Sequence, residues 1–86
     1  MKIALDYDGT FTLDPDFWSS FIKLAVESGH EVVIVTKRYL EEEIRDAPCN
    51  VIYTSRQAKL FSGAIKAFNP DIWIDNNPLD IVGYPI

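Results

Sequence analysis

Residues 2–10 read Lys-Ile-Ala-Leu-Asp-Tyr-Asp-Gly-Thr, a short apolar run that ends in two aspartates, Asp6 and Asp8. An apolar run of this length stopped by Asp-Gly predicts a buried β-strand over residues 2–7. Two carboxylates one residue apart at a strand end repel each other, and Mg²⁺, a hard cation that prefers oxygen ligands, is the usual means of neutralising them. Because Asp and Gly are also ordinary turn residues, an acidic turn after a buried strand explains these residues equally well.

Strand-like and helix-like segments alternate along the rest of the chain. Apolar runs predict strands at residues 31–36, 50–54 and 71–75. The strand at residues 31–36 contains the continuous run Val-Val-Ile-Val, which is typical of a strand buried on both faces. Helices are predicted at residues 14–28, 39–47 and 56–68. Asp14 is the expected N-cap of the first helix, with Pro15 at its first position and Gly29 after its end. This alternation predicts one α/β domain over residues 1–86 with a parallel sheet.

Helical spacing gives the expected buried faces. On the first helix the buried residues are expected to be Phe17, Phe21, Leu24 and Ala25, widened by Trp18, Ile22 and Val26. On the last helix they are expected to be Leu60, Ala64, Ile65 and Ala67. The tail over residues 78–86 is too apolar for a free segment, so we expect it to pack on the sheet or on a second subunit. A homo-oligomer therefore stays open.

Composition argues against several classes of protein. The formal net charge of −5 disfavours non-specific binding to nucleic acids or membrane surfaces, because such binding uses basic patches. Cys49 is the only cysteine, so no internal disulfide can form, which fits a reducing compartment. The sequence has no signal-peptide layout, and no apolar stretch approaches the roughly 18 residues of a membrane span. We therefore expect a soluble, cytoplasmic protein.

Each predicted strand is followed by polar residues. Asp6 and Asp8 follow the first strand, and the other three lead into Thr-Lys-Arg at 36–38, Thr-Ser-Arg at 54–56 and Asp-Asn-Asn at 75–77. Ligands of parallel α/β sheets bind beyond the carboxyl ends of the strands, so this recurrence predicts a single site. Arg38 and Arg56 flank its expected mouth and are candidates to hold anionic groups of a substrate. Simple solvation of strand ends is the alternative explanation.

These segments resemble the motifs of the haloacid-dehalogenase-like (HAD) superfamily, most of whose members are phosphatases. Residues 6–10, Asp-Tyr-Asp-Gly-Thr, match the first motif in full, and Thr36 stands where the second motif places a Thr or Ser. Lys59 fits the third motif, a cation on the helix before the fourth strand, better than Lys66 does. The chain is also similar to a group of very small, uncharacterised members of this superfamily, with which it shares residues 53–59 and the Trp-Ile-Asp strand.

The fourth motif departs from its commonest form. Asn76 stands where a second aspartate often follows Asp75. The segment looks like the Asp-Asn-x-Pro version seen in the superfamily's small protein-serine phosphatases, in which the amide contributes to the metal site. Asp80 is a further acidic candidate at the edge of this site.

The resemblance implies a three-layer Rossmann-like fold with about four parallel strands in the order 3-2-1-4 and no cap domain. It also implies a Mg²⁺-dependent phosphatase that acts on a phosphorylated small molecule or macromolecule. Its catalytic residues would be Asp6 as the nucleophile that forms an aspartyl-phosphate, Asp8 as general acid and base, and Thr36 and Lys59 as charge-stabilising groups. Its metal ligands would be Asp6, the Asp8 carbonyl, and Asp75 or Asn76, while Gly9 and Thr10 would lie against the substrate phosphate.

Two other functions stay open at this point. The first helix starts only about six residues after Asp8, so no lid covers the expected site. An open site and the Asn76 departure also suit a catalytically weak or inactive domain that binds metal and a phosphorylated ligand or protein. A phospho-acceptor receiver domain uses a similar acid cluster, but its acceptor aspartate ends the third strand. Here that strand ends in Thr54 and Ser55, which disfavours a receiver.

Overall fold

The computed structural model describes residues 1–83, which form a parallel sheet with helices on both sides. The strands are β1 (Lys2–Asp6), β2 (Glu31–Thr36), β3 (Val51–Tyr53) and β4 (Ile72–Ile74). Within the described residues the sheet has 4 strands in the order β3-β2-β1-β4, all pairs being parallel. The predicted order 3-2-1-4 is therefore confirmed.

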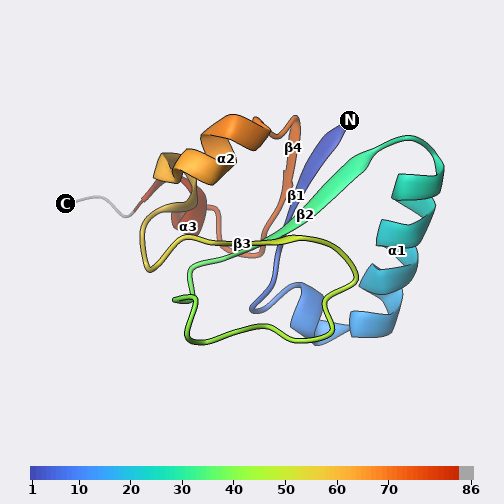
Figure 1. Cartoon of the computed structure of the whole chain (residues 1–86), viewed down its shortest axis with the longest axis horizontal. Coiled ribbons are helices and arrows are strands. Elements are labelled where there is room, and N and C mark those ends of the chain that lie inside the picture. The colour runs from blue at the N-terminus through green and yellow to red at the C-terminus, as the bar shows by residue number, and fades with distance from the viewer. Residues whose placement is uncertain (84–86) are drawn as a thin grey trace.

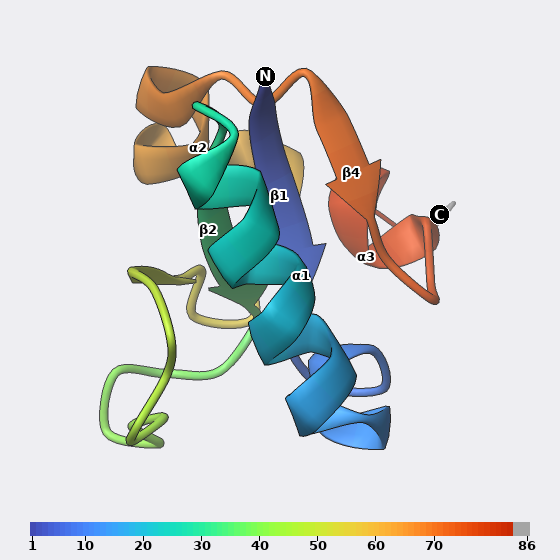
Figure 2. The ribbon, with the colours of Figure 1, turned by 90° about the vertical axis from the view of Figure 1, so that its right-hand side faces the viewer.

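Helices cover the two faces of the sheet. The helical elements are η1 (Phe11–Leu13), α1 (Pro15–Glu27), η2 (Lys59–Phe61), α2 (Gly63–Phe68) and α3 (Leu79–Val82). Figures 1 and 2 show α1 on one side of the sheet and α2 on the other, with α3 on the α2 side. Since β1 and β2 are covered on both faces, side chains of both parities along these strands are buried.

The core is divided into two clusters by the sheet. On the α1 side, Ile3 and Leu5 of β1 pack with Ile34 of β2 and with buried residues of α1. On the α2 side, the alternate residue Ala4 packs with Val33, Val35 and Ile65. This alternation follows from the two-residue period of side chains along a strand. Because the strands are parallel and β1 lies between β2 and β4, the carboxyl ends of these three strands lie together at one edge of the sheet.

Helix α1 begins where the sequence predicts. The Asp14 carboxylate accepts a hydrogen bond from the Phe17 N–H at 3.2 Å, and Pro15 occupies the first helical position. The predicted buried face of this helix was partly wrong. Ile22 and Ala25 are buried and Trp18 and Phe21 are half-buried, whereas the residues expected to be buried but exposed are Phe17, Leu24 and Val26. The residues that are buried or half-buried follow the i, i+3, i+4, i+7 spacing of one helical stripe, so the covered face is narrower than predicted.

Two predicted helices differ from the structure. Residues 39–47 form an irregular loop rather than a helix, and in this loop the Ile44 N–H donates to the Tyr53 hydroxyl at 2.8 Å. The segment 56–68 is split into a turn, η2 and α2, since Lys59 and Ser62 turn inward. Of the residues expected to be buried there, Ile65 is buried, whereas those found exposed are Leu60, Ala64 and Ala67.

The tail contains the short helix α3, which packs against η2 rather than on the sheet. The predicted packing of residues 84–86 falls outside the described residues. No helix within residues 1–83 is long and apolar enough to cross a membrane.

Candidate active site

A buried lysine lies between two aspartates at the carboxyl edge of the sheet. The Lys59 Nζ atom lies 2.6 Å from Asp6 Oδ1 at the end of β1 and 2.6 Å from Asp75 Oδ2 just after β4. The Lys59 side chain is only 1% exposed. Removing charges from water is costly unless they are paired, and here one ammonium pairs with two carboxylates. Lys66 is exposed on α2, so the structure brings Lys59 and not Lys66 to the acids.

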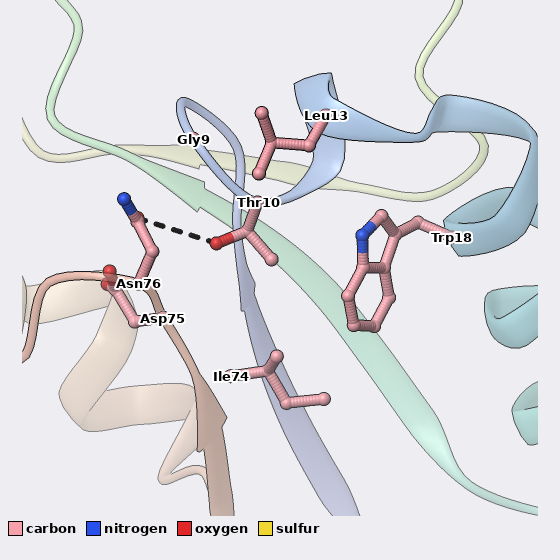
Figure 3. Close-up of a pocket in the computed structure, with 7 residues that line it drawn as sticks. All are labelled: Gly9, Thr10, Leu13, Trp18, Ile74, Asp75 and Asn76. Carbon is pink, nitrogen blue, oxygen red and sulfur yellow. Dashed lines mark hydrogen bonds between the residues drawn. The ribbon is translucent and has the colours of Figure 1, made fainter.

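The second oxygen of Asp6 faces a threonine. The Thr10 hydroxyl lies 3.1 Å from Asp6 Oδ2 and a longer 3.5 Å from the side-chain oxygen of Asn76 (Figure 3). Burial raises the pKa of the Asp6 carboxyl, while the Lys59 ammonium and the Thr10 hydroxyl oppose that rise. Both Asp6 oxygens are thus fixed in orientation, and the ammonium favours the charged form of the carboxyl.

Asp75 and Asn76 are adjacent but have different surroundings. Asp75 uses both carboxylate oxygens inside the protein, because Oδ1 accepts from the Asn77 N–H at 2.9 Å and Oδ2 accepts from Lys59. Asn76 instead lies against the turn after β1, where a Cβ added at Gly9 would come within 2.6 Å of the amide nitrogen. Gly9 also has a φ of +87°, which favours glycine. The turn therefore needs glycine both for its backbone and to admit the amide.

Asp8 points to a different group of residues. Its carboxylate accepts from Arg38 Nε at 3.1 Å, from Arg38 Nη2 at 2.7 Å and from the Thr36 hydroxyl at 3.2 Å. The two-pronged hydrogen bond from Arg38 lowers the pKa of Asp8, with Thr36 adding to the effect. Asp8 is therefore ionised at neutral pH. Sequence reasoning placed Arg38 at the mouth but missed this pairing, since the spacing of the two residues does not show which acid a loop arginine meets.

The remaining predicted residues line two cavities. The first, of about 280 Å³, is open to solvent beside Asp75, and Figure 3 shows its lining residues: Gly9, Thr10, Leu13, Trp18, Ile74, Asp75 and Asn76. Arg56 is not there; it pairs with Glu42 at 2.7 Å, in the neighbourhood of Asp8. Asp80 pairs with Lys37 at 3.4 Å in that same neighbourhood. The main-chain N–H groups of Gly9 and Thr10 donate within their own turn, to Thr12 Oγ1 at 3.0 Å and to the Tyr7 carbonyl at 3.4 Å.

The residues predicted to hold Mg²⁺ are Asp6, Asp8, Asp75 and Asn76. Among residues 1–83, no three His, Cys, Asp or Glu side chains gather with the spacing of a metal site. A site made only of carboxylates is therefore not formed, because Asp8 is held by Arg38 and Asp75 by Lys59. The Asn76 amide oxygen is less engaged than the Asp75 carboxylate, because its contact with the Thr10 hydroxyl is a long 3.5 Å, and amide and carboxylate oxygens are both hard ligands. Asn76 is therefore a candidate inner ligand, with the carboxylate of Asp6 on the other side of Thr10.

Comparison with protein-family models, with curated proteins and with solved structures found no match to this chain.

Proposed function

We propose that this protein is a Mg²⁺-dependent phosphatase that forms an aspartyl-phosphate on Asp6. The observation that carries the proposal is the environment of that carboxylate, with Lys59 2.6 Å from one oxygen and Thr10 3.1 Å from the other. A carboxylate fixed in this way at a strand end, beside an open cavity, is oriented for attack on a phosphorus atom. The HAD-like fold, with its three layers, belongs to the same proposal.

Charge balance is the main task of the remaining residues. Attack of an anionic carboxylate on an anionic phosphate requires nearby positive charge. Lys59 offsets one of the two negative charges of Asp6 and Asp75, and in the proposed reaction it would reduce the repulsion between Asp6 and the phosphate. Mg²⁺ bound by Asp6, the Asp8 carbonyl and Asn76 would neutralise further charge on the phosphate. Asp75 orients Lys59, since its other oxygen is held by the Asn77 N–H.

Asp8 is the proposed proton-transfer group. Because Arg38 lowers its pKa, the carboxylate form predominates, which is the form needed to activate water for hydrolysis of the aspartyl-phosphate. Protonating an alkoxide leaving group would fall to the minor, protonated form of Asp8, whereas an aryl leaving group departs as a phenolate and needs no proton in that step. We therefore expect substrates with good leaving groups, such as aryl phosphates, to react faster than alkyl phosphates. Asp8→Asn should slow turnover of alkyl phosphates more than turnover of aryl phosphates.

The same Arg38–Asp8 pair favours a second candidate function. If Arg38 keeps Asp8 ionised throughout, the protein is a catalytically weak domain that binds metal and a phosphorylated ligand. The two functions share one site and differ only in turnover.

The deciding experiment measures hydrolysis of a panel of aryl and alkyl phosphates with Mg²⁺ and with a chelator. The wild type should show Mg²⁺-dependent turnover, and Asp6→Asn should abolish it, because an amide is a far poorer nucleophile. Asp46→Asn, an exposed aspartate of the loop 39–47, is the matched control and should retain activity. Activity in Asp6→Asn equal to that of the wild type would eliminate the mechanism. Absence of turnover in the wild type across the panel would favour the binding domain.

A further inference from the structure

A second cavity, of about 560 Å³, opens on the Asp8 side of the site. It is lined only by charged residues: Asp8, Lys37, Arg38, Glu42, Arg56 and Asp80. None of these residues lines the cavity beside Asn76, so Asp8 borders a separate space. In the proposed reaction Asp8 exchanges protons with the leaving oxygen. This second cavity is therefore where the leaving group of a substrate would lie.

The backbone brings two arginines to this cavity from different strands. The Arg56 N–H donates to the Lys37 carbonyl at 2.7 Å and the Ser55 N–H donates to the Arg38 carbonyl at 3.2 Å, so the segments after β2 and β3 run side by side. Ser55 and Arg56 have φ values of 53° and 65°, the left-handed region that side chains other than glycine rarely adopt. Two strained residues in succession indicate that the position of Arg56 is maintained against a conformational cost.

The guanidinium groups are held in place and keep unused donors. Arg38 stacks on the Tyr7 ring and Arg56 stacks on the Tyr39 ring, each at 5.2 Å from the ring centroid. Among the described residues, the Arg56 side chain donates one hydrogen bond, to Glu42, although a guanidinium offers five N–H groups. The Asp8 carboxylate, by contrast, already accepts three hydrogen bonds. The Arg56 side chain therefore has spare donors that suit an acceptor ligand, whereas the Asp8 carboxylate has little room for a further donor.

We propose that Arg38 and Arg56 bind a second phosphate on the leaving group, so that the preferred substrate is a phosphomonoester whose alcohol carries another phosphate. This inference rests on the proposed function for the phosphate that is cleaved. A phosphate dianion has enough oxygens to accept from the fork of Arg56 and also from the Arg38 N–H groups that Asp8 does not use, whereas one fork satisfies a carboxylate. It would displace Glu42 from Arg56, and this exchange costs little because the two side chains of that pair are 53% and 41% exposed and a solvated ion pair is weak.

The test compares three ligands that share the same short carbon chain: propanediol monophosphate, propanediol bisphosphate and the phosphate ester of hydroxypropionate. With Mg²⁺ present, the wild type should show kcat/KM for the bisphosphate about tenfold to a hundredfold above that for the monophosphate. In Arg56→Gln this ratio should fall close to one. Arg45→Gln is the matched control, because Arg45 is 84% exposed and pairs with Glu43, and it should keep the wild-type ratio.

Three results would overturn the inference. They are a ratio near one in the wild type, a ratio unchanged in Arg56→Gln, or a carboxylate ligand as good as the bisphosphate. Calorimetric binding to Asp6→Asn separates this inference from the proposed function. One outcome is that the wild type hydrolyses no ligand while Asp6→Asn binds the bisphosphate more tightly than the monophosphate, and adding Arg56→Gln removes that difference in affinity. This result would support the phosphate subsite and reject the phosphatase. Equal binding of the two ligands would reject the subsite whatever the activity.

Discussion

At the scale of single residues, the burial of Lys59 links the stability of this protein to its proposed chemistry. Its ammonium is the only basic group within hydrogen-bond distance of Asp6 or Asp75 among residues 1–83, and both carboxylates are almost fully buried. Burying two acids with one base leaves a net negative charge, which is unfavourable for folding alone. The same excess charge is favourable once a cation binds. Sites of this kind exchange stability for function.

Lys59→Met should destabilise the fold by about 3–5 kcal/mol, because it leaves two buried carboxylates without a cation. Lys66→Met, on the exposed side of α2, is the control and should change stability by less than about 0.5 kcal/mol. The pKa of Asp6 is already raised by burial, and loss of the ammonium raises it further. A carboxyl whose pKa is higher in the folded than in the unfolded state favours folding while it is protonated. This contribution to stability is lost as pH rises through the folded-state pKa. In denaturant titrations, the free energy of unfolding of Lys59→Met should therefore fall further below that of the wild type as pH rises from acidic to neutral. A difference between the two proteins that does not change with pH would contradict the charge argument.

At the scale of elements, the sheet was predictable and its loops were not. The continuous apolar run of β2 and the alternation of strands with helices fix the layers, because a strand buried on both faces needs a helix on each. The loop 39–47 has helix-forming residues, yet two of its N–H groups bind side chains, Tyr39 to Glu42 and Ile44 to Tyr53. Such contacts override local propensity. Asp6 was named from its place at the end of an apolar strand, and Lys59 from the resemblance of its segment to a known motif. The pairing of Arg38 with Asp8 was not predicted, since it depends on how two loops meet.

The turn after β1 gives a prediction at this scale. Gly9→Ala and Gly29→Ala both place a side chain at positive φ, +87° and +90°, so each should cost about 1 kcal/mol of stability from the backbone. Around Gly29 there is space for a methyl group, whereas at Gly9 the methyl would meet the Asn76 amide at 2.6 Å. Gly9→Ala should therefore also weaken Mg²⁺ binding, measured by calorimetry, and Gly29→Ala should not. Equal Mg²⁺ affinity in the two variants would show that Asn76 is not an inner ligand.

At the scale of the whole molecule, the short connections leave the carboxyl edge of the sheet open. Residues 7–14 join β1 to α1 and residues 37–50 join β2 to β3, so within residues 1–83 neither connection is long enough to form a lid domain. Substrate selection must then come from the edge itself. One cavity has Asn76 and Trp18, and the other has only charged residues with two arginines. The proposed phosphate chemistry would take place on one side of Asp8 and the proposed binding of a second phosphate on the other.

Binding of Mg²⁺ at the proposed site should stabilise the folded molecule as a whole. A metal that binds only the folded protein stabilises it by about 1.4 kcal/mol at ten times its dissociation constant. For a domain of this size that gain raises the melting temperature by roughly 6–11 °C. Asp6→Asn should lose most of this rise and Asp46→Asn should keep it. Sodium chloride of equal ionic strength separates site binding from screening of the net charge of −5, because screening would raise the melting temperature of all three proteins alike. A Mg²⁺-specific rise that survives in Asp6→Asn would place the metal elsewhere and remove Asp6 from the site.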